Sequence, residues 1–173
     1  SKYDMDIKQF TVDILESLNH FSENHNDIKL DNIVKCSDKY KLIDWDKTGP
    51  RDKVIRATTY TTNPIKLYLN YGVSNIVKLT FGTQHFINKQ SIGFPVKGVT
   101  STSEFKELYS RIMEEYDEEI NSKSKKELLE KYKDTFDTFS VGMTLFYAIY
   151  HFKLDYQKYR SLINSLTDFI SKK

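Results

Sequence analysis

Residues 25–32 read HNDIKLDN, and after a short interval residues 41–46 read KLIDWD. Asp27 is followed by Lys29 and Asn32, and Asp44 lies beyond a polar turn. Phosphoryl transfer from a nucleotide needs a carboxylate that orients the attacking hydroxyl, oxygen ligands for magnesium, and a cation beside the moving group. These residue types at this spacing therefore indicate phosphotransfer chemistry.

The residues around this stretch predict where it sits in the fold. Apolar residues recur at spacings of three and four over residues 6–21, which predicts an amphipathic helix before the loop. Two short β-type runs at 32–34 and 40–43 flank a turn-rich tripeptide at 37–39, so we expect a hairpin. Residues 44–66 show no periodicity and contain one glycine and two prolines, which predicts a loop.

The remaining sequence predicts mostly helices. Glycines and a proline break the short apolar runs of residues 67–103. A helical apolar stripe covers 104–120, and a second helix is expected at 125–133. Residues 137–151 are nearly all apolar, which predicts a buried helix, and an amphipathic helix is expected at 155–171. The predicted fold class is therefore mainly α, or α+β overall, with one small β-hairpin.

The 25–32 loop resembles the catalytic loop of eukaryotic-type Ser/Thr protein kinases, His-Arg-Asp-x-Lys-x-x-Asn. Residues 43–46 are similar to the Asp-Phe-Gly magnesium loop that follows it in that family. The resemblance implies two catalytic residues. Asp27 would be the base that accepts the proton of the substrate hydroxyl, and Lys29 would contact the γ-phosphate of ATP.

The same resemblance implies the cofactors ATP and Mg²⁺. Lys29, Asn32 and Asp44 would bind the nucleotide and its metal, with Asn32 and Asp44 as the metal ligands. Asp46 would add a carboxylate nearby. His25 would pack the loop without taking part in the chemistry.

A second match lies far downstream, where residues 137–147 read DTFSVGMTLFY. This segment looks like the buried central helix of protein kinases, which opens Asp-x-Trp-Ser-x-Gly. The resemblance implies that Asp137 is a buried carboxylate bonded to the backbone of the catalytic loop. It covers about 1–66 and 134–171, so residues 1–173 are expected to form a kinase-like C-lobe. Residues 67–133 are then expected to be an insertion between the activation segment and the central helix.

The sequence departs from the family at several positions. Asn26 replaces the arginine that pairs with a phosphorylated activation loop, and Asp46 replaces a glycine that permits an unusual backbone conformation. The nearest counterpart of the Ala-Pro-Glu motif is residues 60–64, which lack the glutamate. The glycine-rich loop and strand lysine of the N-lobe are also missing. We therefore expect an N-lobe from a missing segment or a separate chain, and little or no activity from these residues alone.

Three functions are compatible with these features. A Ser/Thr protein kinase acting on a protein substrate is favoured by Lys29 and by the opening of the 137–147 helix. A small-molecule kinase is the second, because Asn26 and Asp46 are similar to residues of choline kinases and aminoglycoside phosphotransferases. A kinase-derived binding or scaffold module without activity, a pseudokinase, is the third, because the N-lobe motifs are missing.

Composition limits the partners and the compartment. The 173 residues, 39% of them hydrophobic, suit one folded domain. The net charge of +2 gives no reason to expect a nucleic-acid partner. The lone cysteine, Cys36, favours a reducing compartment, so we expect an intracellular, cytoplasmic protein. No apolar run approaches the roughly 18 residues that span a bilayer, so no membrane span is expected.

Overall fold

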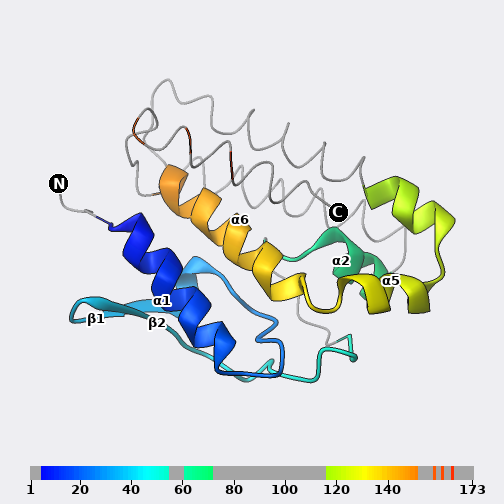
Figure 1. The fold of residues 1–173 in the computed structure, drawn as a ribbon, viewed down its shortest axis with the longest axis horizontal. Helices are drawn as coiled ribbons and strands as arrows, with labels where there is room; N and C mark the ends of the chain where they lie inside the picture. The colour runs from blue at the N-terminus through cyan, green and yellow to red at the C-terminus, as the bar shows by residue number, and fades with distance from the viewer. Residues whose placement is uncertain are drawn as a thin grey trace.

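The computed structural model describes residues 5–54, 61–71 and 116–151, together with positions 158, 161 and 165. The helices and strands with defined bounds are α1 (Ile7–Asn19), β1 (Ile33–Cys36), β2 (Lys39–Leu42), α2 (Pro64–Tyr71), α5 (Lys125–Tyr132) and α6 (Phe136–His151). A single 3₁₀ turn over Leu30–Asn32 leads into β1, and residues 116–122 are also helical. The described part is mainly helical with a small two-stranded antiparallel sheet, as the sequence predicted (Figure 1).

Helix α1 lies across the hairpin and is fixed to it by one buried carboxylate (Figure 1). Asp6 caps the helix, because its side chain accepts the backbone N–H of Gln9 at 3.0 Å. Asp13 is 4% exposed, and its Oδ2 accepts the backbone N–H of Tyr40 on β2 at 2.8 Å. The rings of Phe10 and Tyr40 meet edge to face, with centroids 5.1 Å apart. These contacts orient the hairpin relative to the helix that precedes the loop.

The predicted hairpin is confirmed and has a defined register. Ile33 pairs with Leu42, and Ser37 adopts a left-handed conformation (φ 56°) in the tight turn. Pairing continues one step beyond the strands, because the backbone N–H of Ile43 donates to the carbonyl of Asn32 at 2.8 Å. The hairpin therefore brings Asn32 beside the segment that contains Asp44.

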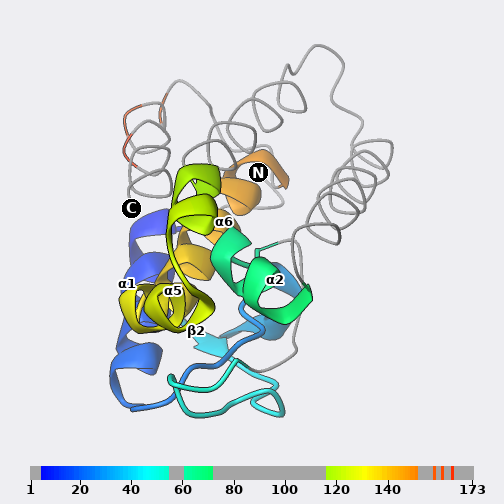
Figure 2. The same ribbon diagram turned by 90° about the vertical axis from the view of Figure 1, so that its right-hand side faces the viewer.

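Helix α6 is the buried centre of the described fold, as the sequence predicted. Figure 2 shows it between α1 and α2, with α5 nearer the viewer. Nearly all of its described side chains are buried, which accounts for its almost continuous apolar sequence. The largest apolar side chains that are fully buried come from several elements: Phe10, Ile14, Ile28, Ile65, Leu128, Met143 and Ile149.

Helix α2 corrects the prediction that residues 44–66 form a loop, because it already begins at Pro64. The side chain of Asn63 accepts the backbone N–H of Ile65 at 2.8 Å, and its carbonyl accepts that of Leu67 at 3.0 Å. An asparagine cap followed by proline at the first helical position is a helix-start signal, which we had interpreted as loop composition. The loop prediction holds for 44–54, and residues 55–60 lie outside the described part.

Helix α5 agrees with the helix predicted at 125–133. A capping box begins it: Glu127 donates its backbone N–H to Ser124 Oγ at 3.2 Å, and the Ser124 N–H donates to Glu127 Oε2 at 2.8 Å. Leu128 and Tyr132 are buried, so the described part of 67–133 contributes to the core.

Two further helix predictions fall largely outside the described residues. Of the helix predicted at 104–120, only positions 116–120 are described, and these are helical. Of the helix predicted at 155–171, positions 158, 161 and 165 are helical and exposed, while the expected inward-facing residues lie outside the described part.

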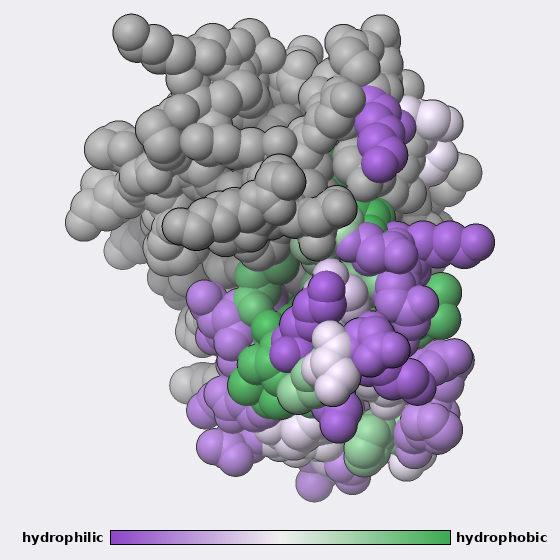
Figure 3. Space-filling view, turned by 90° about the vertical axis from the view of Figure 1, so that its left-hand side faces the viewer, coloured by the Kyte–Doolittle hydropathy of each residue, from purple (hydrophilic) through white to green (hydrophobic). Residues whose placement is uncertain are grey.

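Figure 3 shows mostly hydrophilic side chains on the face at the hairpin end, with a band of hydrophobic ones between them. No helix within the described ranges is long and apolar enough to cross a bilayer.

Candidate functional site

The predicted catalytic loop is anchored by Asp137, at the start of α6. Its Oδ2 accepts the backbone N–H of His25 at 2.6 Å, and its Oδ1 accepts that of Asn26 at 3.1 Å. Asp137 is 8% exposed. Burial raises the pKa of Asp137, and the two backbone hydrogen bonds oppose this by stabilising the carboxylate. The expectation of a buried, hydrogen-bonded Asp137 is confirmed.

A polar stripe on α6 extends this support along the loop. Asp137, Ser140 and Thr144 follow one another at spacings of three and four, which places them on one face of an otherwise apolar helix. Ser140 Oγ donates to the carbonyl of Thr61 at 2.9 Å. Thr144 Oγ1 donates to the carbonyl of Ser140 at 2.7 Å and lies 3.4 Å from the carbonyl of Ile28. Thr61 Oγ1 donates to the same Ile28 carbonyl. The loop and the segment before α2 are thus held together on this helix face.

His25 packs the loop, as predicted. Its side chain is fully buried, its Nε2 lies 3.1 Å from the carbonyl of Ile43, and its Nδ1 accepts the backbone N–H of Asp27 at 3.2 Å. This pattern requires the neutral tautomer with hydrogen on Nε2, as inferred from the hydrogen-bond network. Burial lowers the pKa of His25, against the backbone hydrogen bond to Ile43 and the charges of Asp137, Asp27 and Asp44. His25 therefore stays neutral at physiological pH.

Three of the predicted site residues form one cluster. Lys29 Nζ lies 3.2 Å from Asp27 Oδ1. Asn32 Nδ2 donates to Asp27 Oδ2 at 3.0 Å and to the Asp27 carbonyl at 2.9 Å. The Asp27 carboxylate is largely buried but keeps some exposed area, and the Lys29 side chain is about a quarter exposed. A carboxylate is thus presented near the surface beside a cation.

Asp44 leaves the hairpin next to the residue that pairs with Asn32, and among the described contacts it bonds to no side chain of this cluster. It follows Ile43, whose backbone pairs with that of Asn32, so it leaves the hairpin at the same end. Asp44 is exposed and adopts a left-handed conformation, with φ of 61°. Such a conformation costs a non-glycine residue free energy and occurs often at functional sites. Asp46 is also exposed.

The chemistry of these side chains fits a magnesium ion better than a transition metal. Because Asp27 accepts from the Asn32 amide nitrogen, the Asn32 side-chain oxygen is the atom left to face a cation. The Asp44 carboxylate is a second hard oxygen ligand. Within the described ranges, no three or more His, Cys, Asp and Glu side chains are grouped to hold a metal. Magnesium often takes only one or two protein ligands together with nucleotide phosphates.

Asn26 connects three segments, a role that the sequence did not reveal. Its backbone is left-handed (φ 69°), a conformation that asparagine tolerates. Its Nδ2 donates to the carbonyls of Asn24 at 3.0 Å and Lys47 at 2.9 Å. Its Oδ1 accepts from Lys66 Nζ on α2 at 2.9 Å.

Lys66 is the functional candidate that sequence reasoning missed. It is 3% exposed, although lysine is seldom fully buried. Burial lowers the pKa of Lys66 to about 8, against the opposing charges of Asp137 and Asp27. The sequence signal for a buried Lys66 is its position inside the apolar run that follows Pro64, and this signal alone is weak.

Stability should therefore depend on pH through Lys66. Since the folded pKa is about 8 against 10.5 for the unfolded chain, the unfolded state binds more protons between these values. The free energy of unfolding should rise with pH over this window, by on the order of 3 kcal/mol in total. Urea unfolding at pH 7.5, 8.5 and 9.5 would measure it. The rise should be absent in Lys66→Met, and an equal rise in both proteins would contradict this assignment.

The sequence matches no protein-family model and no curated protein, and the fold matches no solved structure.

Proposed function

We propose that this chain is the C-lobe of a Ser/Thr protein kinase and contributes the catalytic loop and the magnesium ligands. The observation that carries the proposal is the Asp27 cluster. Asp27, Lys29 and Asn32 lie within hydrogen-bond or ion-pair distance, on a loop anchored by Asp137 of a buried helix. Anchoring matters because positioning and electrostatics supply most of the catalysis of phosphoryl transfer.

Each residue has a distinct role in this proposal. Asp27 orients the serine or threonine hydroxyl of the substrate and accepts its proton. Lys29, whose ammonium lies 3.2 Å from that carboxylate, balances its charge and contacts the γ-phosphate. Asn32 and Asp44 would hold Mg²⁺, which neutralises charge on the phosphates of ATP when bound.

The proposal requires a partner lobe. The 173 residues contain no glycine-rich nucleotide loop of the Gly-x-Gly-x-x-Gly type. We propose that an N-lobe, from a segment outside these residues or from another chain, covers the nucleotide. Without an N-lobe, this chain would contact ATP on one side only.

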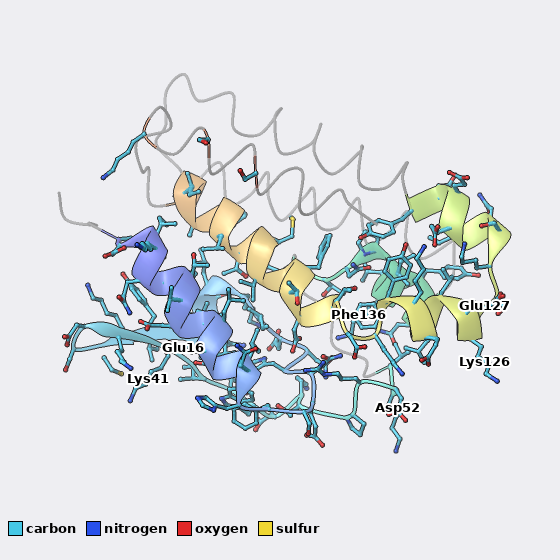
Figure 4. The ribbon with its side chains drawn as sticks, in the orientation of Figure 1. Glu16, Lys41, Asp52, Lys126, Glu127 and Phe136 are labelled. Atoms are coloured by element: carbon cyan, nitrogen blue, oxygen red, sulfur yellow. The ribbon has the colours of Figure 1, made fainter. Side chains whose placement is uncertain are left out.

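A metal-dependent nucleotide site should be detectable by binding. With the N-lobe present, Mg²⁺ should strengthen ATP binding, and Asp44→Ala should reduce that gain by about tenfold or more because a direct ligand is lost. Isothermal titration of ATP with and without Mg²⁺ measures it. Lys41→Ala, which removes an exposed side chain on β2 (Figure 4), is the control and should bind as the wild type does. An equal response to Mg²⁺ in wild type and Asp44→Ala would count against the site.

The hydrogen bonds of Asn26 bear on the small-molecule alternative. That alternative rests on Asn26 and Asp46. The Asn26 side chain is buried and bonded to Asn24, Lys47 and Lys66, so packing accounts for the asparagine without reference to a substrate. Of these two residues, only the exposed Asp46 then supports a small alcohol as the substrate. We therefore retain a protein as the proposed substrate.

A further inference from the structure

The buried ammonium of Lys66 lies at the junction of three segments. It extends from α2 and donates to Asn26 Oδ1 at 2.9 Å, while Asn26 also holds the carbonyls of Asn24 and Lys47. Asn26 immediately precedes Asp27, so this one side chain connects α2 to the residue before the proposed base. Helix α2 follows Thr61, which is itself bonded to the loop carbonyl of Ile28.

Packing alone does not explain a lysine at this position. Burying an ammonium is costly unless it is compensated, and its described hydrogen bond goes to a neutral amide oxygen. The charged groups that act on it are Asp137, at the start of α6, and Asp27 in the loop, both of which favour its protonated form. His25, on the same loop, is neutral and adds no charge. The positive charge of Lys66 thus offsets the negative charges of Asp137, which anchors the loop, and of Asp27, the proposed base.

We propose that Lys66 is a positioning residue: its ammonium holds Asn26 in place and thereby fixes the position of the Asp27 carboxylate. This inference rests on the proposed kinase function. Lys66 itself touches no reacting atom. Its effect passes through the Asn26 side chain and through the charge that it places near Asp27 and Asp137.

The expected consequence is a catalytic defect without a binding defect. Removing the ammonium leaves Asn26 Oδ1 buried without its donor, so the left-handed turn before Asp27 loses one of its restraints. A displacement of the base by about 1 Å can cost on the order of 100-fold in rate. ATP binding depends on Lys29, Asn32 and Asp44, and should change little.

Three variants of the full protein test the proposal. Lys66→Met removes the charge while keeping the length of the side chain, and Lys66→Arg keeps the charge. Asn26→Gly removes the hydrogen bond to the ammonium together with those to the carbonyls of Asn24 and Lys47, and glycine accepts the left-handed φ of this position. The control is Lys126→Met, since Lys126 is an exposed lysine on α5 that points away from the fold (Figure 4).

The first measurement is amide hydrogen exchange in residues 24–29, which needs no enzymatic activity. Lys66→Met should speed exchange by about tenfold, the value of one hydrogen bond to a charged group, and Asn26→Gly should speed it by at least as much. The double variant should exchange as Asn26→Gly does, because that substitution already removes the hydrogen bond to Lys66. The control should exchange as wild type does. Unchanged exchange in Asn26→Gly would overturn the proposal even if Lys66→Met failed to fold.

The second measurement is phosphotransfer across pH. Lys66→Met should lower kcat by about 10- to 100-fold, with KM for ATP within about twofold. Wild-type activity should decline as pH rises through about 8, where Lys66 loses its proton, and this decline should vanish in Lys66→Arg because guanidinium stays charged.

A merely structural lysine would lower the melting temperature but leave kcat and the pH profile unchanged, which would overturn the proposal. If the wild type transferred no phosphate, the kinase proposal would fail, and loop exchange would still decide whether Lys66 holds the loop.

Discussion

Replacing Asp27 by asparagine is expected to lower kcat for phosphotransfer by about 10²- to 10⁴-fold, the usual contribution of a general base. Asparagine has nearly the same size and can still accept from Asn32, but it cannot take the hydroxyl proton. The charge next to Lys29, 3.2 Å away, is also lost. Initial rates with saturating Mg-ATP, together with the dissociation constant of ATP, would separate this effect from weaker binding.

The matched control for this substitution is Asp52→Asn. Asp52 is exposed in the loop after β2 and points away from the fold (Figure 4), so its loss should leave the rate unchanged. A rate for Asp27→Asn within about threefold of wild type would show that this carboxylate is not the base, since general bases contribute far more.

Replacing Asp137 by alanine is expected to lower the free energy of unfolding by about 2–6 kcal/mol, because two donors lose their acceptor and each costs about 1–3 kcal/mol. Those donors are the backbone N–H groups of His25 and Asn26, held at 2.6 and 3.1 Å. The substitution also removes a negative charge near the buried Lys66. Urea denaturation followed by circular dichroism would measure the loss.

Asp134→Ala is the control for this experiment. Asp134 is exposed and pairs with Arg51 at 3.4 Å, and surface pairs of this kind contribute about 0–1 kcal/mol. If Asp137→Ala were no less stable than Asp134→Ala, the buried carboxylate would not be anchoring the loop.

Local sequence patterns were enough to predict most of the described fold. Helix α1, the hairpin and α6 each carry a periodicity or turn signal that acts within a few residues. Helix α2 differs from the predicted loop because Asn63 and Pro64, residue types common in loops, here form an asparagine cap before proline, which starts a helix. The error came from a local signal that was present but misinterpreted.

The candidate site was predictable where its residues share one segment. Asp27, Lys29 and Asn32 lie within six positions of sequence, so their meeting follows from a tight loop. Asp44 lies at the same end of the hairpin because antiparallel pairing returns the chain to Asn32.

Two other buried charged residues, Lys66 and Asp13, were not predicted, because their partners are remote in sequence. Lys66 bonds to Asn26 across 40 positions, and Asp13 bonds to Tyr40 across 27. Lysine side chains are mostly exposed to solvent, so the sequence predicts an exposed Lys66. Composition does not distinguish it from the other lysines. Asp13 did carry a signal, since it lies three residues after Phe10 on the apolar side of α1.

The most direct test of the central claim is transfer of label from γ-³²P-ATP with Mg²⁺. It should be run on this chain alone and on the protein completed by an N-lobe, with a generic protein substrate and with choline. We expect label on serine or threonine of the protein for the completed form, and little or none for the chain alone. Label on choline but not on protein, or no nucleotide binding by the completed form, would contradict it.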